Sequence, residues 1–478
     1  MQNPQQDQTS TTHQQIQALF QQQRHEYLRN PMTSANSRLT LLKQLKQALL
    51  DYQEPLCDAL NADYNGRSKQ DSLTSDILPC IMNIKHTCKK LKKWMRPERR
   101  FAGLLLAPAK IKVHYQPLGV IGIVVPWNFP VMLSLGPLIS AIASGNRAMI
   151  KLSEFTPHTN QVMIEMLASV FPSDQVACIE GEAEQAAQFT ALPFDHLLFT
   201  GSTTVGHHVM RAAADNLTPV TLELGGKSPT IVGPDVDIDH AVERIIYGKC
   251  LNAGQICVAP DYILLPREKM NRFVTSYQKR FATMYPQGVN SDDYSSIINT
   301  RQYQRLQSWL ADAKAKGAQV IPCVEGQHQE DRRQRLTTHL LLNTTDEMTV
   351  MQEEIFGPIL PLIPYDSIEE AIDYIRNRPR PLALYLLSYD KLLQQKIITQ
   401  THAGGMCIND SVFHVAADDA PFGGIGPSGM GHYHSIEGFK TFSKAKTVLT
   451  QGKLSSSVLM HPPYGQWIQK MVFKIFLR

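Results

Sequence analysis

The sequence predicts an α/β protein built on a doubly wound parallel sheet, and three observations lead to this prediction. Short β-rich runs alternate with helical patterns from Val120 onward. A glycine-bracketed turn follows one of these runs and opens a helical pattern, as at the ligand-binding edge of a parallel sheet. The 478 residues are 43% hydrophobic and 19% charged, which is enough to bury a large core.

Five β-rich runs define the first alternating region. They are VIGIVVP (120–126), RAMIKL (147–152), QVACIEG (175–181), HLLFTG (196–201) and PVTLELGG (219–226). Helical patterns lie between them, for example at 157–171 and 203–216. Strand, helix and strand repeated at this spacing favour parallel strands covered on both faces. We therefore predict a Rossmann-like domain here.

The segment before this region is predicted to be helical. Leucines recur near 3.6-residue spacing from position 37 to position 94. The basic stretch 85–100 is interpreted as the solvated face of a surface helix, with an acidic-partner or membrane-surface patch as the alternative. Residues 1–30 are polar and Gln-rich and lack the apolar core of a signal peptide, so we expect a flexible tail.

A second alternating region runs from Ile238 to about Ala420. It contains β-rich runs at 261–266 and 382–388 with a helical pattern near 301–316, which indicates a second α/β domain. The last segment, 461–478, is basic and amphipathic but too short to span a bilayer. We expect it to pack on the protein's own surface, and contact with a membrane surface is the alternative.

Charge and cysteine content exclude several classes of function. The formal charge of +4 is small for this length and predicts no nucleic-acid partner. The eight cysteines form no C-x-x-C pair, so a zinc ribbon or a thioredoxin-like redox site is unsupported and no metal is expected. Reduced thiols without a signal peptide are typical of a cytoplasmic protein.

The glycine-bracketed turn is G-S-T-T-V-G, from Gly201 to Gly206. A strand feeding this turn would place free backbone N–H groups at a helix N-terminus, where a pyrophosphate binds well. A tight turn with Ser202 or Thr203 as helix N-cap explains the same spacing. The G-x-G-x-x-G match from Gly424 to Gly429 follows no clear strand and contains Pro427, so we interpret it as a loop.

Cys257 is the candidate nucleophile. It lies in N-A-G-Q-I-C-V, a loop of small residues after the helical pattern that begins at Ile238, where a thiol should be exposed enough to react. Cys178 lies inside a β-rich run and is expected to be buried and inert. A lone cysteine is more often structural, so the assignment depends on the residues that accompany it.

Two polar residues at predicted strand ends accompany Cys257. Glu223 ends an apolar run before two glycines, where burial should raise its pKa and suit it to general-base chemistry. Asn128 in V-P-W-N-F-P follows another run and has an amide that suits an oxyanion. A hydrogen-bonded structural glutamate and a turn asparagine are the alternatives.

Six motifs in one order resemble the NAD(P)-dependent aldehyde dehydrogenase superfamily. They are V-P-W-N-F-P, F-T-G-S-T-T-V-G, L-E-L-G-G-K-S-P, N-A-G-Q-I-C-V, E-E-I-F-G-P and P-F-G-G-I-G-P-S-G-M-G. The similarity covers roughly residues 37–451. The ending S-G-M-G-H-Y-H resembles the class-three branch, and the segments at 63–68, 91–100 and 258–262 resemble its bacterial coniferyl aldehyde dehydrogenases.

The resemblance implies a role for each motif residue. Cys257 aligns with the nucleophile, Glu223 with the general base and Asn128 with the oxyanion donor. The implied cofactor is NAD, with NADP tolerated, and the substrate a hydrophobic, aromatic (coniferyl-type) aldehyde. The residues implied to bind the cofactor are Trp127, Lys151, Glu154, Gly201, Ser202, Val205, Gly206, Glu354 and Phe356.

The sequence departs from the family pattern at two positions. Leu152 stands where the family usually has proline, which is expected to loosen that turn. Pro137 stands where many relatives have a lysine, so a proton relay through that lysine is absent. Other hypotheses are a medium- or long-chain fatty aldehyde dehydrogenase at a membrane surface, an acylating relative, and an idle structural protein; Glu223 disfavours the acylating relative.

The resemblance also implies a division of the chain. It gives a flexible tail (1–30), an NAD(P)-binding domain (31–225), a catalytic domain (226–420), and a return segment with an oligomerisation strand and amphipathic tail (421–478). Part of a small β oligomerisation arm interrupts the first domain near 100–116. Open edge strands near 110–116 and 446–450 need a partner, so a homodimer is expected.

Overall fold

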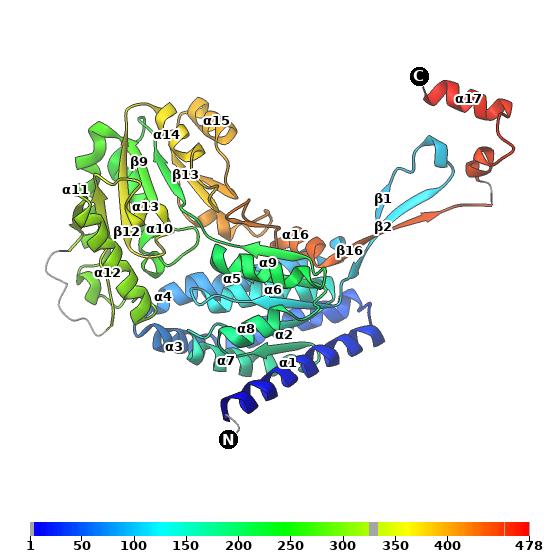
Figure 1. Cartoon of the computed structure of the whole chain (residues 1–478), viewed down its shortest axis with the longest axis horizontal. Coiled ribbons are helices and arrows are strands. Elements are labelled where there is room, and N and C mark those ends of the chain that lie inside the picture. The colour runs from blue at the N-terminus through cyan, green and yellow to red at the C-terminus, as the bar shows by residue number, and fades with distance from the viewer. Residues whose placement is uncertain (1–3, 325–332, 454, 478) are drawn as a thin grey trace.

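The computed structural model describes residues 4–324, 333–453 and 455–477. Its strands form three sheets (Figure 1). Two sheets belong to α/β lobes that lie beside each other, and the third forms a slender arm that projects from them. The predicted α/β class, with a doubly wound cofactor domain, a second α/β domain and a β arm, is confirmed.

The first sheet has the strand order β15-β7-β6-β3-β4-β5. All neighbours are parallel except β15, which runs antiparallel to β7. The strands are β3 (Val120–Val124), β4 (Arg147–Lys151), β5 (Val176–Ile179), β6 (His196–Thr200), β7 (Val220–Glu223) and β15 (Gly429–Met430). The five predicted runs therefore become five adjacent parallel strands.

Helices cover both faces of this sheet. Ile121 and Ile123 of β3 enter the core on one face, while Val120 and Val124 enter the core on the other, as period-2 alternation requires. The first face packs against α2 (Ala35–Asp51), α3 (Gln53–Tyr64), α5 (Leu78–Trp94), α6 (Pro130–Ser144) and α7 (Pro157–Ala168). The second packs against α1 (Pro4–Arg29), α8 (Ala183–Thr190) and α9 (Thr203–Ala214).

The predicted flexible tail is wrong for most of residues 1–30. Residues 4–29 form α1, and the first three residues lie outside the described ones. Ile16 and Phe20 are buried against the sheet, and the Gln23 amide donates to Ala148 O at 3.0 Å and to Ser173 O at 2.9 Å. Three buried residues at one-turn spacing hold a helix whose other residues are mostly polar.

The second sheet has the order β10-β11-β12-β9-β8-β13-β14, parallel except at β10. Its strands are β8 (Pro229–Val232), β9 (Tyr262–Pro266), β10 (Gln319–Pro322), β11 (His339–Leu342), β12 (Ile359–Tyr365), β13 (Ala383–Leu387) and β14 (Gly405–Ile408). One face carries α10 (Ile238–Cys250), α11 (Met270–Met284), α12 (Thr300–Ala315) and α13 (Thr349–Gln352), and the other carries α14 (Ile368–Arg376) and α15 (Lys391–Gln400).

The arm is the antiparallel sheet β1-β2-β16. Strand β2 (Lys110–Pro117) is central: it pairs with β1 (Glu98–Arg100) on one side and with β16 (Ser443–Thr450), which follows α16 (Ser435–Thr441), on the other. The expectation of an open edge at 110–116 is therefore wrong, because both sides of β2 are paired, whereas β16 lies at an edge of the arm. Beyond β16 lies α17 (Trp467–Phe476), at the far end of the arm (Figure 1). The domain boundaries given above stay a prediction.

The prediction that the C-terminal segment packs on the protein's own surface is wrong for the single chain. Trp467 is 72% exposed and Ile475 is 62% exposed. The helix packs against the short turn 456–460 on its own arm, which carries it away from both lobes (Figure 1). Arg478, the last basic residue of this segment, lies outside the described residues.

The basic stretch 85–100 lies mostly on α5. Leu91 and Trp94 are buried, whereas Lys85, Lys89 and Lys92 are exposed, so the prediction of a solvated helix face is confirmed. Across the described residues, no helix has the length and apolar character needed to cross a membrane.

Candidate functional site

The predicted site residues gather at one edge of the first sheet. Lys151 and Glu223 are the last residues of β4 and β7, and Gly201 directly follows β6. Trp127 and Asn128 follow β3 between its end and the start of α6. Because the carboxyl ends of parallel strands share an edge, these residues surround the crevice in which open α/β sheets bind ligands.

The loop before Cys257 has an unusual backbone. Asn252 and Ala253 have φ values of 48° and 51°, and Gly254 has a φ of 73°. A Cβ on Gly254 would lie 2.7 Å from the Gly357 carbonyl oxygen, so a side chain is excluded there. Two non-glycine residues in the left-handed region persist only where the surroundings fix them.

Gln255 supplies that fixation. Its side-chain amide donates to Asn252 O at 2.9 Å and to Ser296 O at 3.0 Å. Its side-chain oxygen accepts the Ile298 N–H at 3.0 Å. All three bonds are buried, so the turn that presents Cys257 is rigidly held two residues before the thiol.

Asn128 is tied to the same loop. Its Nδ2 donates to Gln255 O at 3.2 Å, and its own carbonyl accepts from Arg67 Nη1 at 2.8 Å and from Asn252 Nδ2 at 3.2 Å. An amide nitrogen carries two hydrogens, so one bond to Gln255 leaves a second donor. The geometry places a fixed amide donor beside the Cys257 loop.

A buried ion pair supports Asn128 from behind. Arg67 Nη2 and Asp76 Oδ2 are 2.7 Å apart, and both side chains are fully buried. Asp76 Oδ1 also accepts the N–H groups of Val131 and Met132, which begin α6, at 3.1 and 3.0 Å. Breaking such a pair leaves an unpaired buried charge, so Arg67 and Asp76 act together to position the V-P-W-N-F-P turn.

The Glu223 carboxylate is buried. Its side chain is 3% exposed, and neither carboxylate oxygen has a hydrogen-bond partner among the described residues. Desolvation raises the pKa of this carboxyl well above its ordinary value, in the predicted direction. A structural glutamate would be hydrogen-bonded, so this alternative is disfavoured.

The Cys257 thiol is half-buried rather than well exposed. Burial first, and then the charges of Glu354 and Glu223, raise its pKa to about 12, while backbone hydrogen bonds oppose the shift. Both carboxylates therefore act electrostatically on the thiol. Cys178 is also half-buried, not fully buried as expected, and burial raises its pKa to about 12.

The glycine-bracketed turn ends at the N-terminus of α9. Ser202 Oγ accepts the Val205 N–H at 3.4 Å, so the N-cap interpretation is correct. The Gly201 N–H donates to Glu223 O at 3.0 Å, and a Cβ on Gly206 would lie 2.8 Å from Leu224. Val205 is 46% exposed, and the first N–H groups of the helix have no intrahelical acceptor, which leaves room for an anionic group.

Lys151 and Glu154 lie at the end of β4. Lys151 Nζ donates to Leu152 O at 2.7 Å and to Gly181 O at 2.6 Å. Burial lowers the pKa of Lys151, while the nearby charge of Glu154 opposes that shift. The Glu154 side chain is exposed and free to accept hydrogen bonds.

Glu354 and Phe356 reach the site from the second lobe. Glu354 Oε1 is buried and lacks a partner in the described ranges, and a Cβ on Gly225 would collide with its carboxylate. Burial raises the Glu354 pKa to about 8. Phe356, with a φ of 49°, packs edge-on against Trp127 with ring centroids 5.3 Å apart. A ribose with its base fits this arrangement. Glu354 Oε1 can accept a hydrogen bond, Gly225 leaves space beside it, and Trp127 and Phe356 offer aromatic contacts.

Several residues near the site escaped prediction. Lys227 pairs with Asp261 and donates to Val350 O and Glu353 O, and Asp261 accepts the Ile355 N–H, so this pair positions the segment that carries Glu354. Tyr433 is buried, and burial raises its pKa, as do the charges of Glu223 and Cys257. In the sequence, the only indication that these residues have a role is that they lie inside or beside the motifs quoted above.

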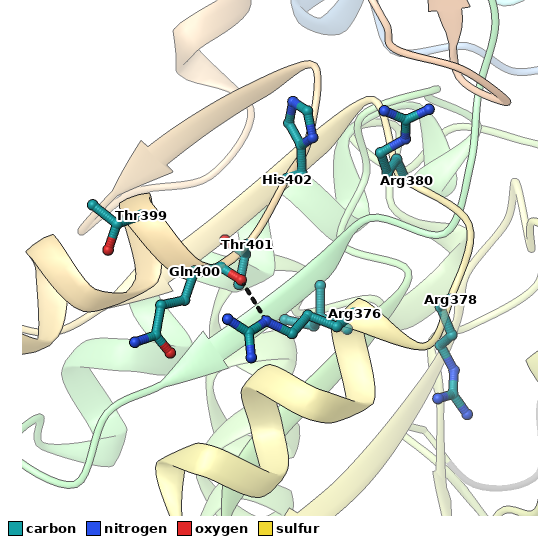
Figure 2. Close-up of a pocket in the computed structure, with 8 residues that line it drawn as sticks. Arg376, Arg378, Arg380, Thr399, Gln400, Thr401 and His402 are labelled. Atoms are coloured by element: carbon teal, nitrogen blue, oxygen red, sulfur yellow. Dashed lines mark hydrogen bonds between the residues drawn. The ribbon is translucent and has the colours of Figure 1, made fainter.

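A separate hollow of about 440 Å³ lies between the ends of α14 and α15 (Figure 2). Two of its three arginines are already engaged: Arg376 donates to Gln400 O at 2.8 Å, and Arg378 pairs with Asp346. None of the predicted site residues lines it. We therefore assign it no part in the chemistry.

Comparison with known proteins agrees with this geometry. The family model described as "Aldehyde dehydrogenase family" matches residues 2–448. A probable coniferyl aldehyde dehydrogenase of Pseudomonas aeruginosa is 52% identical over 97% of this chain and 97% of its own length. A coniferyl aldehyde dehydrogenase of a Pseudomonas species is 45% identical over 91% of each chain.

Two solved structures of aldehyde dehydrogenases share this fold. The substrate-bound state of Staphylococcus aureus AldH superposes with a TM-score of 0.91 at 37% identity, over 97% of this chain and 99% of that one. A Mycobacterium tuberculosis aldehyde dehydrogenase complexed with NAD+ has a TM-score of 0.83 at 28% identity, over 93% and 91% of the two chains.

Proposed function

The chain belongs to the aldehyde dehydrogenase family and oxidises an aldehyde to its acid with NAD(P), and we propose that its substrate is a hydrophobic, aromatic aldehyde of coniferyl type. The observation that carries the site assignment is the convergence of a half-buried thiol, an unpartnered buried carboxylate and a fixed amide donor. The names of the two Pseudomonas relatives support the aromatic substrate.

In the proposed reaction, Cys257 sulfur forms a bond to the aldehyde carbon. Its proton must first leave, and Glu223 is suited to accept it because the raised pKa makes this carboxylate a stronger base. The carbonyl oxygen becomes an oxyanion, which the free Asn128 N–H and the Cys257 backbone N–H stabilise. Asn128 is bonded to the Gln255 carbonyl, and the Gln255 side chain fixes the loop that carries Cys257, so little reorganisation is needed.

A bound nicotinamide would supply the hydride acceptor, and loss of hydride from the adduct would leave a thioester on Cys257. Glu223 passes the thiol proton to solvent and so becomes a base again. It then removes a proton from water, the water oxygen attacks the thioester carbon, and the C–S bond breaks to release the acid and the Cys257 thiolate. In this proposal Lys151 and Glu154 hold the adenosine ribose, and Gly201, Ser202, Val205 and Gly206 line the pyrophosphate. Glu354 holds the nicotinamide ribose, with Trp127 and Phe356 beside it.

We propose that NAD is preferred and NADP tolerated. Glu154 is exposed and would repel a 2′-phosphate while accepting bonds from ribose hydroxyls. Lys151 offsets that repulsion only in part, because its ammonium already donates to two carbonyls. The ratio of kcat/KM for the two cofactors measures this preference.

Replacing the nucleophile tests the function. We predict that Cys257→Ala abolishes oxidation of coniferyl aldehyde, while NAD binding measured by calorimetry survives because the proposed cofactor contacts lie elsewhere. Cys407→Ala is the matched control and should retain activity. Appreciable turnover by Cys257→Ala would contradict the assignment, and a kcat/KM that peaks with long alkyl aldehydes would favour the fatty-aldehyde alternative.

A further inference from the structure

Two histidines near the site have buried ring nitrogens without partners. His434 is 4% exposed, and its Nε2 has no hydrogen-bond partner among the residues that the structure describes. In His414 both Nδ1 and Nε2 are buried and unpartnered within the described part of the chain. Buried polar atoms normally have partners, so three such nitrogens in one region indicate a ligand or an ordered group between them.

The two imidazoles flank one aromatic ring. Phe422 stacks on His434 with centroids 5.2 Å apart and contacts His414 at 6.1 Å. Tyr433 packs edge-on against His434 at 4.6 Å, and Tyr385 packs edge-on against His414 at 5.7 Å. These five rings form one aromatic cluster. Among the described residues, the imidazole nitrogens are the only buried polar ring atoms of this cluster without a hydrogen-bond partner.

This cluster adjoins the reacting groups. The Tyr385 hydroxyl donates to the carbonyl of Val258, the residue after Cys257. Charges on Glu223 and Cys257 raise the pKa of Tyr433. Each histidine therefore contacts a tyrosine ring that faces the catalytic residues or the loop that carries Cys257.

We propose that His414 and His434 hydrogen-bond the oxygen substituents on the aromatic ring of the aldehyde, and this inference rests on the proposed function. Burial lowers the pKa of both imidazoles to about 4, so each ring is neutral at pH 7 and offers one donor and one acceptor. A phenol hydroxyl needs both, and a methoxy oxygen needs a donor.

Such a site discriminates against substrates that lack the hydroxyl. Binding the bare ring would leave the buried nitrogens unpaired, and this penalty makes selection for a hydroxyl stronger than selection for a methylene. We expect 4-hydroxycinnamaldehyde to exceed cinnamaldehyde in kcat/KM by about 10-fold or more. The two aldehydes differ by one oxygen atom, so size and conjugation are matched.

The test is this ratio of kcat/KM in the wild type and in four variants. It should fall to near one in His414→Phe and His434→Phe, which keep the ring contacts, and persist in His434→Gln, which keeps a donor and an acceptor. Phe422→Leu is the control: it removes the central ring but no polar atom, so both rates should fall together. A ratio near one in the wild type, or an unchanged ratio in both phenylalanine variants, would overturn the inference.

The same assay separates this inference from the proposed function. If cinnamaldehyde and its hydroxylated form are oxidised equally well, the aromatic aldehyde proposal stands and the histidine assignment fails. If neither aryl aldehyde is oxidised while alkyl aldehydes are, the aromatic proposal itself fails, and the histidine assignment fails with it.

Discussion

In the cofactor-free chain, the Cys257 thiol keeps its proton at neutral pH. Burial and the charges of Glu354 and Glu223 all act against the thiolate, and the pKa is about 12. Only the thiolate is a strong nucleophile, so activation must come from a base or from a positive charge placed nearby. Such a thiol is protected from chance reaction until the cofactor and the aldehyde are present.

Removing a neighbouring charge should make this thiol more reactive. At pH 9, above the Glu354 pKa of about 8, Glu354→Gln removes a negative charge, lowers the Cys257 pKa and so speeds alkylation of the cofactor-free enzyme by iodoacetamide. In the wild type the rate should rise about 10-fold per pH unit, because the thiolate fraction does so below the pKa. A plateau below pH 9 would contradict the raised pKa.

Single residues were predictable where a motif contains them and not where a distant contact defines them. Cys257, Glu223 and Asn128 stand out in the sequence as polar residues at strand ends or in a glycine-containing loop. Gln255 lies in the same loop, yet its role depends on Ser296 and Ile298, which no spacing rule brings together with it. The thiol's burial was missed because it depends on residues from both lobes.

At the scale of elements, α1 was the clearest error. Its sequence is polar almost throughout, so neither hydrophobic periodicity nor composition favours a helix. Its docking depends on a few buried residues and on Gln23. The Gln23 side chain donates to the carbonyls of Ala148, in β4, and of Ser173, before β5. The parallel strands were predicted well because strands buried on both faces read as continuous apolar runs.

The anchoring of α1 is testable. Phe20 is 1% exposed and packs edge-on against Phe194 at 5.4 Å. We predict that Phe20→Ala lowers the free energy of unfolding by about 3–5 kcal/mol, as for other buried aromatic truncations. Leu28→Ala, on the same helix but 67% exposed, should cost within about 0.5 kcal/mol. Equal urea midpoints for the two variants would mean that α1 is not docked in solution.

At the scale of the whole molecule, charge separates the arm from the lobes. Residues 98–117 and 443–478 contain ten Lys or Arg and one acidic residue, Glu98, while the chain as a whole carries +4. The rest of the molecule is therefore net negative. A positive arm with the edge strand β16 complements the lobes of a second copy, which supports the homodimer that we propose.

Light scattering tests this assembly. At micromolar concentration and low salt we predict a mass of twice 53.7 kDa. Reversing two arm charges together, Lys110→Glu with Lys112→Glu, should shift the equilibrium toward monomer, because both lysines lie on β2. A monomeric wild type would refute the proposal.

The apolar face of α17 allows a second test of whether a partner subunit covers the arm. If the partner subunit covers it, anionic vesicles should not sediment the full chain. Vesicle binding that disappears on truncation after Pro463 would instead assign the tail to a membrane surface.

The central claim is that a covalent thioester forms on Cys257 and that Glu223 hydrolyses it. The most direct measurement mixes the Glu223→Gln variant with NAD and coniferyl aldehyde and records both reduced cofactor and intact protein mass. We predict one equivalent of NADH per active site, a protein mass increased by the acyl group, and loss of that adduct when Cys257 is also replaced by alanine. Sustained turnover at the wild-type rate, or a burst of NADH without a covalent adduct, would contradict the account.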